Sequence, residues 1–260
     1  SAVEAVKQPP GHKKGEDKDE AFKLLLDKIY EDRGLDFRRY HQSILKRRVS
    51  LRMIKNSIKT FSDYLMFLIT HPEEYDKLFE VLCINVSEFF RDPDVWDSAR
   101  TLFTEIFAQK SKINEKSITI WSAACASGEE PYSIAMMLQE VSKAIPDVFT
   151  FTIYATDLDP KALRAAQKGE YHERVLKNLS QAQLNRYFTK VNAEYRRIND
   201  DIKKMVTFKS LDLIAQDFIR GTDVVFCRNV FIYFSRSLQD QLLMKFYKSL
   251  KVGGYLILGK

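Results

Sequence analysis

The segment from Ile118 to Met136, which reads ITIWSAACASGEEPYSIAM, limits the possible folds of this chain more than any other stretch. A short apolar run ends in small residues, turns at Ser127 and opens a helix at Glu129. The pattern predicts a strand, a tight turn and a helix N-terminus, where unpaired backbone N–H groups can meet a ligand. The alternative is an ordinary turn, in which Ser127 caps the helix and the acidic residues favour its dipole.

The second half of the chain alternates between strand-like and helical patterns. This alternation predicts an α/β fold with a mainly parallel sheet and helices on both faces. Between Gly169 and Lys204 the pattern weakens, and we expect an insertion with a small structure of its own. The strand-like runs are Ser117–Ala123, Val148–Ala155, Met205–Ser210, Asp223–Cys227 and Gly254–Leu258, and the helical runs are Pro131–Ala144, Pro160–Gln167 and Ser237–Leu250.

The first half of the chain has helical spacing throughout. Residues 1–19 are rich in charged residues, Gly and Pro, and we expect a tail or linker there. Apolar residues recur at helical spacing from Glu20 to about Phe90, which predicts a small bundle of short helices. Asp92 and Pro93 suit the start of a further helix. The predicted divisions are a tail at 1–19, a helical domain at 20–92, a connecting helix or linker at 93–116, and an α/β domain at 117–260 with an insertion at about 170–204.

The net charge of +6 and the isoelectric point near 9 suggest acidic partners, such as nucleic acid, anionic lipid or an acidic protein. No run approaches the roughly 18 apolar residues of a membrane span, and no leader of the secretory kind is visible. We therefore expect no membrane insertion and a cytoplasmic location, where the three widely spaced cysteines stay reduced. The histidines are scattered and form no metal-type cluster with the cysteines, so we expect no metal site.

Polar residues end the later strands of the predicted sheet. Ligands of doubly wound sheets bind beyond the carboxyl ends of the strands. Asp157 ends the second strand, where a carboxylate can accept hydrogen bonds from ribose hydroxyls, while Asp159 suits a helix cap because a proline follows it. The residues that follow the next two strands are Asp212, Leu213, Arg228, Asn229 and Tyr233. Core packing is the alternative role for Tyr233.

The turn before Glu129 matches neither the G-x-G-x-x-G of dinucleotide sites nor the phosphate-binding loop. Its adjacent carboxylates, Glu129 and Glu130, would repel a phosphate but suit a ligand with positive charge. S-adenosylmethionine has a sulfonium, an amine and no phosphate, so it fits this turn. Upstream, Phe89, Phe90 and Arg91 are either core aromatics beside a solvated arginine or a lid that points Arg91 at a carboxylate.

Four motifs occur in a fixed order: NVSEFFRDP, WSAACASGEEPYS, ATDLD and FCRNVFIYF. Together they resemble the chemotaxis-receptor protein-glutamate O-methyltransferases, the CheR family, over about residues 20–259. The resemblance implies a small helical N-terminal domain, a class I S-adenosylmethionine-dependent methyltransferase domain and a small antiparallel β insertion. It also implies methylation of glutamates on the cytoplasmic helices of chemoreceptors, with S-adenosylhomocysteine as product.

The resemblance also implies site residues. Arg91 and Tyr233 would be catalytic and orient the acceptor carboxylate. Ser87 stands where threonine is frequent in the family, a change that keeps the hydroxyl. The family's sheet continues past Gly259, so an exposed sheet edge is expected in a chain that stops at Lys260. The residues that the resemblance places at the cofactor are Asn85, Ser87, Arg91, Ala123, Glu129, Asp157, Asp212, Leu213, Arg228 and Asn229.

A basic segment suggests where a partner docks. From Arg38 to Lys59 the chain has eight Lys or Arg and no acidic residue. Helical spacing predicts one shared face, either a solvated surface or a dock for a Glu-rich receptor helix. The residues of that predicted face are Arg48, Arg52, Lys55 and Lys59.

Two other functions remain open at the level of the sequence. A nucleic-acid methyltransferase fits the basic face, but the Asn/Asp-Pro-Pro-aromatic motif of amino-directed DNA enzymes is absent. A non-catalytic S-adenosylmethionine-binding signalling module, or a methyltransferase with another acceptor, fits the same cofactor turn.

Overall fold

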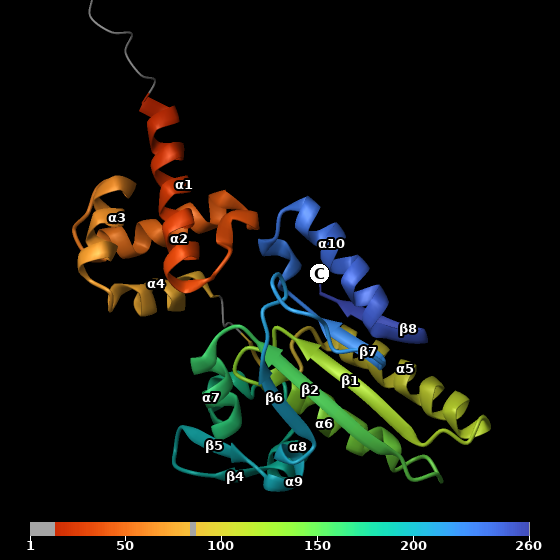
Figure 1. Cartoon of the computed structure of the whole chain (residues 1–260). Helices are drawn as coiled ribbons and strands as arrows, with labels where there is room; N and C mark the ends of the chain where they lie inside the picture. Colours follow the sequence, from red (N-terminus) through yellow and green to blue (C-terminus); the bar gives the residue numbers. More distant parts are fainter. Residues whose placement is uncertain (1–13, 84–86, 260) are drawn as a thin grey trace, which may run out of the picture. The chain divides into compact units, whose positions relative to one another are not determined.

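The structure is a computed structural model that describes residues 14–83 and 87–259. These residues form two compact units, and the first unit ends at Cys83 (Figure 1).

The first unit is a helical bundle around one apolar core, as predicted. The core is formed by one face of each helix and includes Phe22, Leu45, Val49 and Leu68. Gly34 ends the first helix with a φ of +71°, a conformation that glycine adopts without a steric penalty. The elements are α1 (Lys14–Arg33), η1 (Phe37–Arg39), α2 (Gln42–Lys55), α3 (Phe61–Thr70) and α4 (Glu74–Leu82).

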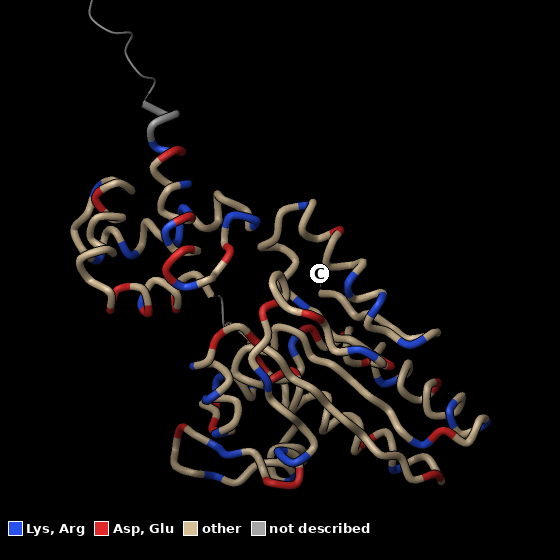
Figure 2. Tube along the Cα trace, in the orientation of Figure 1, with Lys and Arg blue, Asp and Glu red and all other residues tan. Residues whose placement is uncertain are grey.

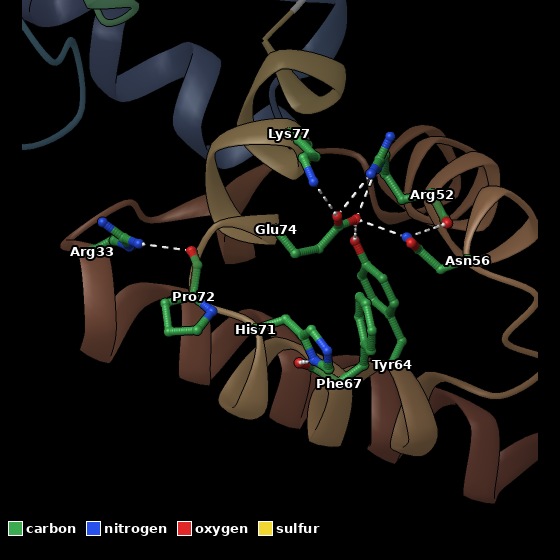
Figure 3. A network of polar contacts seen from close by, with 9 residues as sticks. All are labelled: Arg33, Arg52, Asn56, Tyr64, Phe67, His71, Pro72, Glu74 and Lys77. Carbon is green, nitrogen blue, oxygen red and sulfur yellow. Dashed lines mark hydrogen bonds and ion pairs between the residues drawn. The ribbon is translucent and has the colours of Figure 1, made fainter.

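A buried ion pair joins α2 to α4 (Figure 3). The Arg52 guanidinium donates from Nε and Nη2 to the two carboxylate oxygens of Glu74, at 2.8 and 2.7 Å. The Tyr64 hydroxyl and the Asn56 amide also donate to Glu74, at 2.9 and 3.0 Å. Burial alone would raise the pKa of Glu74, but these hydrogen bonds outweigh burial and hold that pKa below its usual value.

The predicted basic face of four residues is therefore wrong. α2 carries Lys and Arg but no acidic residue (Figure 2), yet Arg52 points into the core beside the inward stripe of Val49 and Met53. Arg48 donates to the Val81 carbonyl at 2.7 Å, and Lys59 lies beyond the end of α2. Of the four predicted residues, only Lys55 is an exposed part of the helix.

The second unit contains a five-stranded parallel sheet in the order β6-β2-β1-β7-β8, which confirms the predicted fold class. Helices cover both faces: Phe226 of β7 stacks on Phe103 of α5, whereas Trp121 of β1 packs against Phe246 of α10. The strands are β1 (Ser117–Ala123), β2 (Thr150–Asp157), β6 (Val206–Ser210), β7 (Thr222–Cys227) and β8 (Leu250–Leu258), and the helices are α5 (Pro93–Lys112), α6 (Glu129–Ser142), α7 (Pro160–Lys168) and α10 (Arg236–Ser249).

A second, three-stranded antiparallel sheet in the order β3-β5-β4 forms the predicted insertion (Figure 1). It enters the chain between α7 and β6, so the parallel sheet is continuous without it. Its elements are β3 (Glu170–His172), η2 (Glu173–Val175), α8 (Gln181–Tyr187), β4 (Phe188–Lys190), β5 (Tyr195–Ile198) and α9 (Asp200–Lys203).

The residues around the expected boundary at 92 belong to the second unit. Phe89 and Phe90 lie in the same apolar core as Trp96 and Phe103 of α5. The region expected as a connecting helix is thus a packed layer of the α/β unit. Within the described residues, β8 has a strand neighbour on one side only, as expected for the edge of this sheet. No described helix is both long enough and apolar enough to cross a membrane.

Candidate functional site

The turn between β1 and α6 has a backbone that L residues rarely adopt. Ala124, Ala126 and Gly128 have positive φ angles of 59°, 48° and 92°. A non-glycine residue in this region costs about 1–2 kcal/mol, and such strain concentrates at functional sites. The Cys125 N–H donates to the Thr156 carbonyl at 2.9 Å and ties the turn to the end of β2. The turn is therefore held in one shape at the carboxyl edge of the sheet.

The residue that precedes α6 is Gly128, and no side chain caps this helix. This excludes the alternative in which Ser127 is the cap. A Cβ atom on Gly128 would lie 2.8 Å from the Ala166 Cβ and 3.1 Å from the Tyr171 hydroxyl oxygen. Both the φ angle and the close packing thus require glycine.

The change Gly128→Ala should lower the free energy of unfolding by about 1–3 kcal/mol, because an added methyl group overpacks this contact. Urea unfolding of the whole chain measures this loss. The matched control is Gly221→Ala, which has a similar φ of +72° but nothing within 4 Å of its Cβ position. Equal losses in the two variants would show that backbone strain, and not the contact with Ala166, determines the effect.

Asp157 fastens the turn to the neighbouring strand. Its carboxylate accepts the Ala126 N–H at 2.8 Å and the Asp159 N–H at 2.9 Å, one on each oxygen. Burial raises the pKa of Asp157, and these backbone bonds oppose that rise. Asp157 therefore also has a structural role in the turn, and each of its oxygens keeps a further lone pair for the predicted ribose hydroxyls. The predicted cap is confirmed, since the Asp159 side chain accepts the Lys161 N–H at 2.8 Å.

Glu129 provides a buried acceptor at the start of α6. Its side chain is almost fully buried, and its Oε2 has no hydrogen-bond partner in the part of the chain that the structure describes. Burial raises the pKa of Glu129 to about 7, although a hydrogen bond from the Ser87 side chain opposes the rise. Buried polar atoms are nearly always paired, so this orphaned oxygen points to a ligand that donates a hydrogen bond or carries positive charge.

Arg228 sits at the end of β7 with its guanidinium buried. Its Nη2 donates to the Arg91 carbonyl at 2.8 Å and to the Asp92 carboxylate at 2.9 Å, and Nη1 lies 3.6 Å from Glu130 Oε2. The guanidinium also stacks over the Trp96 ring, 5.7 Å from its centroid. Burial raises the pKa of Glu130, and the positive charges of Arg228 and Arg91 oppose the rise.

The segment that carries Arg91 is fixed on both sides. Phe90 and Asp92 have left-handed φ angles of 47° and 56°. The Phe90 N–H donates to the Ser133 hydroxyl oxygen at 3.1 Å, and the Arg91 carbonyl also accepts the Trp96 indole N–H at 2.9 Å. The backbone therefore presents Arg91, a partly exposed residue, at a defined position near Glu130.

The other predicted residues surround the same edge of the sheet. The Asp212 carboxylate accepts the Ile214 N–H at 2.7 Å and so shapes the loop after β6. Asn229 has a φ of 58°, and a Cβ on Gly259 would lie 2.7 Å from its nitrogen. The Tyr233 hydroxyl has no hydrogen-bond partner among residues 14–83 and 87–259, which leaves it available to a substrate. Ala123 and Leu213 are buried at the ends of their segments, and Asn85 lies outside the described residues.

The amino-acid sequence matches two described protein-family domains, which together cover most of the chain. Residues 20–83 match the family described as "CheR methyltransferase, all-alpha domain", and residues 85–260 match "CheR methyltransferase, SAM binding domain". The chain belongs to the CheR methyltransferase family. S-adenosylmethionine is therefore its cofactor, and its two family domains coincide with a helical and an α/β part.

Three relatives of this CheR methyltransferase are named "Chemotaxis protein methyltransferase". The protein of Listeria monocytogenes is 34% identical over 89% of this chain and 85% of its own length. The proteins of Borreliella burgdorferi and Escherichia coli K12 are 32% and 30% identical, each over 93% of this chain and 87% and 83% of their own lengths. A solved glycopeptide N-methyltransferase with bound sinefungin matches 60% of this chain and 48% of its own, with a TM-score of 0.36 and 12% identity, too low to support any argument.

The residues of the turn fit the cofactor of the CheR family. S-adenosylmethionine has an amine that donates hydrogen bonds, and Glu129 Oε2 is a buried acceptor without a partner among residues 14–83 and 87–259. Asp157 keeps lone pairs that suit ribose hydroxyls. No phosphate has to be accommodated beside these carboxylates, so the absence of a glycine-rich phosphate loop is consistent with this ligand.

Sequence reasoning missed three residues that shape the site of this CheR methyltransferase. Ser122 donates to Glu130 at 2.7 Å, and its polar side chain in an apolar strand was a usable signal. Tyr171 and Trp96 gave no signal in the sequence beyond that of aromatic core residues. The Tyr171 hydroxyl donates to the carbonyl of Ser127, 44 residues away, and the Trp96 indole donates to the carbonyl of Arg91 in the turn before α5.

Proposed function

We propose that this protein transfers the methyl group of S-adenosylmethionine to glutamate side chains on the cytoplasmic helices of chemoreceptors. The observation that carries the proposal is that one sheet edge has both a buried Glu129 oxygen, without a partner in the described part of the chain, and a firmly held Arg91 segment. The first favours a cationic cofactor, and the second suits an acidic acceptor. The name shared by the relatives, "Chemotaxis protein methyltransferase", supports a role in chemotaxis, and the choice of receptor glutamates is part of the proposal.

In this proposal, separate residues of the chain bind the cofactor and orient the acceptor. When bound, the cofactor supplies an electrophilic methyl group. Glu129 would hold its amine and Asp157 its ribose hydroxyls. The acceptor carboxylate is already ionised near neutral pH, so no general base is needed and catalysis comes from positioning. Arg91 and the Tyr233 hydroxyl would orient that carboxylate, and the neutral ester would lose its attraction to Arg91.

The test is incubation with methyl-labelled S-adenosylmethionine and chemoreceptor cytoplasmic fragments. We expect base-labile label on glutamate, strongly reduced in Arg91→Ala and unchanged in Arg236→Ala, a matched change at a highly exposed position on α10. Cofactor binding by calorimetry without label on any receptor fragment would favour the non-catalytic signalling module. Label on RNA or DNA would favour the nucleic-acid methyltransferase.

We further propose that the exposed face of α2 docks the acidic receptor helix. Arg47 and Lys55 are exposed on this face, and between them lie Leu51 and Ile54, which are 56% and 73% exposed. No acidic residue lies in α2. A face that combines apolar side chains with positive charges suits an amphipathic helix that carries glutamates.

Reversing both charges, in Arg47→Glu with Lys55→Glu, should raise the KM for a receptor fragment roughly tenfold, since each contact at an interface rim is worth on the order of 1 kcal/mol or less. The Kd for S-adenosylmethionine should not change. Lys248→Glu, an exposed reversal on α10, is the control for the change in net charge. An equal rise in KM for the control would mean that overall charge, and not this face, attracts the receptor.

A further inference from the structure

The three-stranded insertion contacts the cofactor turn directly. The Tyr171 hydroxyl of β3 donates to the Ser127 carbonyl at 2.7 Å, immediately before Gly128. The Tyr171 side chain is buried, and burial raises the pKa of its hydroxyl well above the usual value. The hydroxyl therefore remains a donor throughout the pH range in which the protein would work.

The insertion also holds the segment before Arg91. The Phe89 N–H donates to the Val175 carbonyl at 3.0 Å, and the Phe89 carbonyl accepts from the Asn178 side-chain amide at 3.0 Å. Asn178 donates to Glu88 as well, at 3.1 Å. Both backbone polar groups of Phe89 are thus bonded to the insertion.

One aromatic cluster connects these two sets of contacts. The Phe89 ring makes an edge contact with Tyr171 at 4.8 Å between centroids and with Phe188 of β4 at 5.3 Å. Tyr171 thereby touches the turn through its hydroxyl and the Ser87–Arg91 segment through its ring. The parallel sheet is continuous without the insertion, so the topology of the sheet does not require these contacts.

We propose that the insertion is a clamp that holds together the two walls of the cofactor site, which are the turn at 126–129 and the segment at 87–91. Tyr171 and Asn178 are the positioning residues. The inference rests on the proposed location of the cofactor beside Glu129 and Ser87. Tyr171 acts through Ser127 and Phe89. Asn178 acts through the Phe89 carbonyl, so loss of the Asn178 side chain should affect only the wall formed by residues 87–91.

The experiment compares Tyr171→Phe and Asn178→Ala with the control Tyr195→Phe, an exposed tyrosine on β5 of the same insertion. Amide hydrogen exchange in the ligand-free protein and calorimetric binding of S-adenosylmethionine are measured. Loss of one hydrogen bond is worth about a five- to tenfold change in an equilibrium. We expect Tyr171→Phe to raise exchange at both 87–91 and 126–129 and to raise the cofactor Kd by that factor. Asn178→Ala should raise exchange at 87–91 alone, and the control should change neither.

Two results would overturn the clamp. One is a lowered melting temperature in Tyr171→Phe with unchanged exchange at both segments and an unchanged Kd, which would make Tyr171 a packing residue only. The other is faster exchange at a single segment in that variant, which would remove the connection between the walls. Failure of the unmodified protein to bind S-adenosylmethionine would instead overturn the proposed site, while the exchange data would still test the clamp.

Discussion

Replacing Arg52 with methionine should lower the free energy of unfolding of the helical unit by about 3–5 kcal/mol, the usual cost of leaving a buried charge without its partner. Glu74 is 1% exposed and would keep two neutral donors, Tyr64 and Asn56, and a more distant cation, the Lys77 ammonium 4.0 Å from its Oε2. The matched surface variant is Lys28→Met, which removes an i,i+4 pair with Asp32 and should cost less than about 1 kcal/mol. Urea unfolding monitored in this unit measures both changes.

The sign of the pH dependence gives a second test of this ion pair. The pKa of Glu74 is lowered in the folded protein, so its stabilising contribution is present above the unfolded pKa and is lost as pH falls through the folded value. Without Arg52, burial is less opposed and the pKa of Glu74 rises, so the variant should lose less stability than the native protein on acidification. The double variant Arg52→Met with Glu74→Leu should recover most of the loss at neutral pH. If Arg52→Met lowered the free energy of unfolding by no more than Lys28→Met does, the ion pair between Arg52 and Glu74 would not be a major source of stability.

The same residue shows where helical periodicity fails. Counting residues correctly predicted a helix over Arg48 and Arg52, because apolar side chains recur at the right spacing. Periodicity then assigned the arginines to the outer face, since charged side chains rarely enter a core unpaired. The partner that lets Arg52 turn inward, Glu74, is 22 residues away on another helix. Only the tertiary fold brings the two together.

The α/β unit was more predictable because its signals are local. The first strand has the predicted bounds, Ser117–Ala123, and the proline after Asp159 marked a cap that the structure confirms. The strained turn was not predictable in detail, since alanines at 124 and 126 give no sign of a positive φ. The contact of Tyr171 with Ser127, 44 residues apart, likewise depends on how the insertion folds back.

The proposed position of the cofactor amine beside Glu129 predicts that cofactor binding depends on pH. Burial raises the pKa of Glu129 to about 7, and in the proposed site a cationic amine would pair with the ionised carboxylate. Below pH 7 a proton must leave before the amine can pair, so the Kd for S-adenosylmethionine should rise up to about tenfold for each pH unit. Calorimetry between pH 7 and 5.5 tests this, because an α-amine, with a pKa of about 7.7–8.0, stays charged in that range.

Glu129→Gln should raise the Kd by about 30-fold or more at pH 7, since truncating one partner of a buried charge pair costs about 2–5 kcal/mol. It should also remove the pH dependence. Acidification should have the opposite effect on stability from its effect on cofactor binding. Because the pKa of Glu129 is raised in the folded state, the free energy of unfolding should increase as pH falls from about 7 toward the unfolded pKa near 4.5. The glutamine variant should lack this increase. Glu105→Gln on the exposed side of α5 is the matched control. A Kd in the glutamine variant that still rises below pH 7 would assign the titration to another group, and an unchanged Kd would remove Glu129 from the cofactor site.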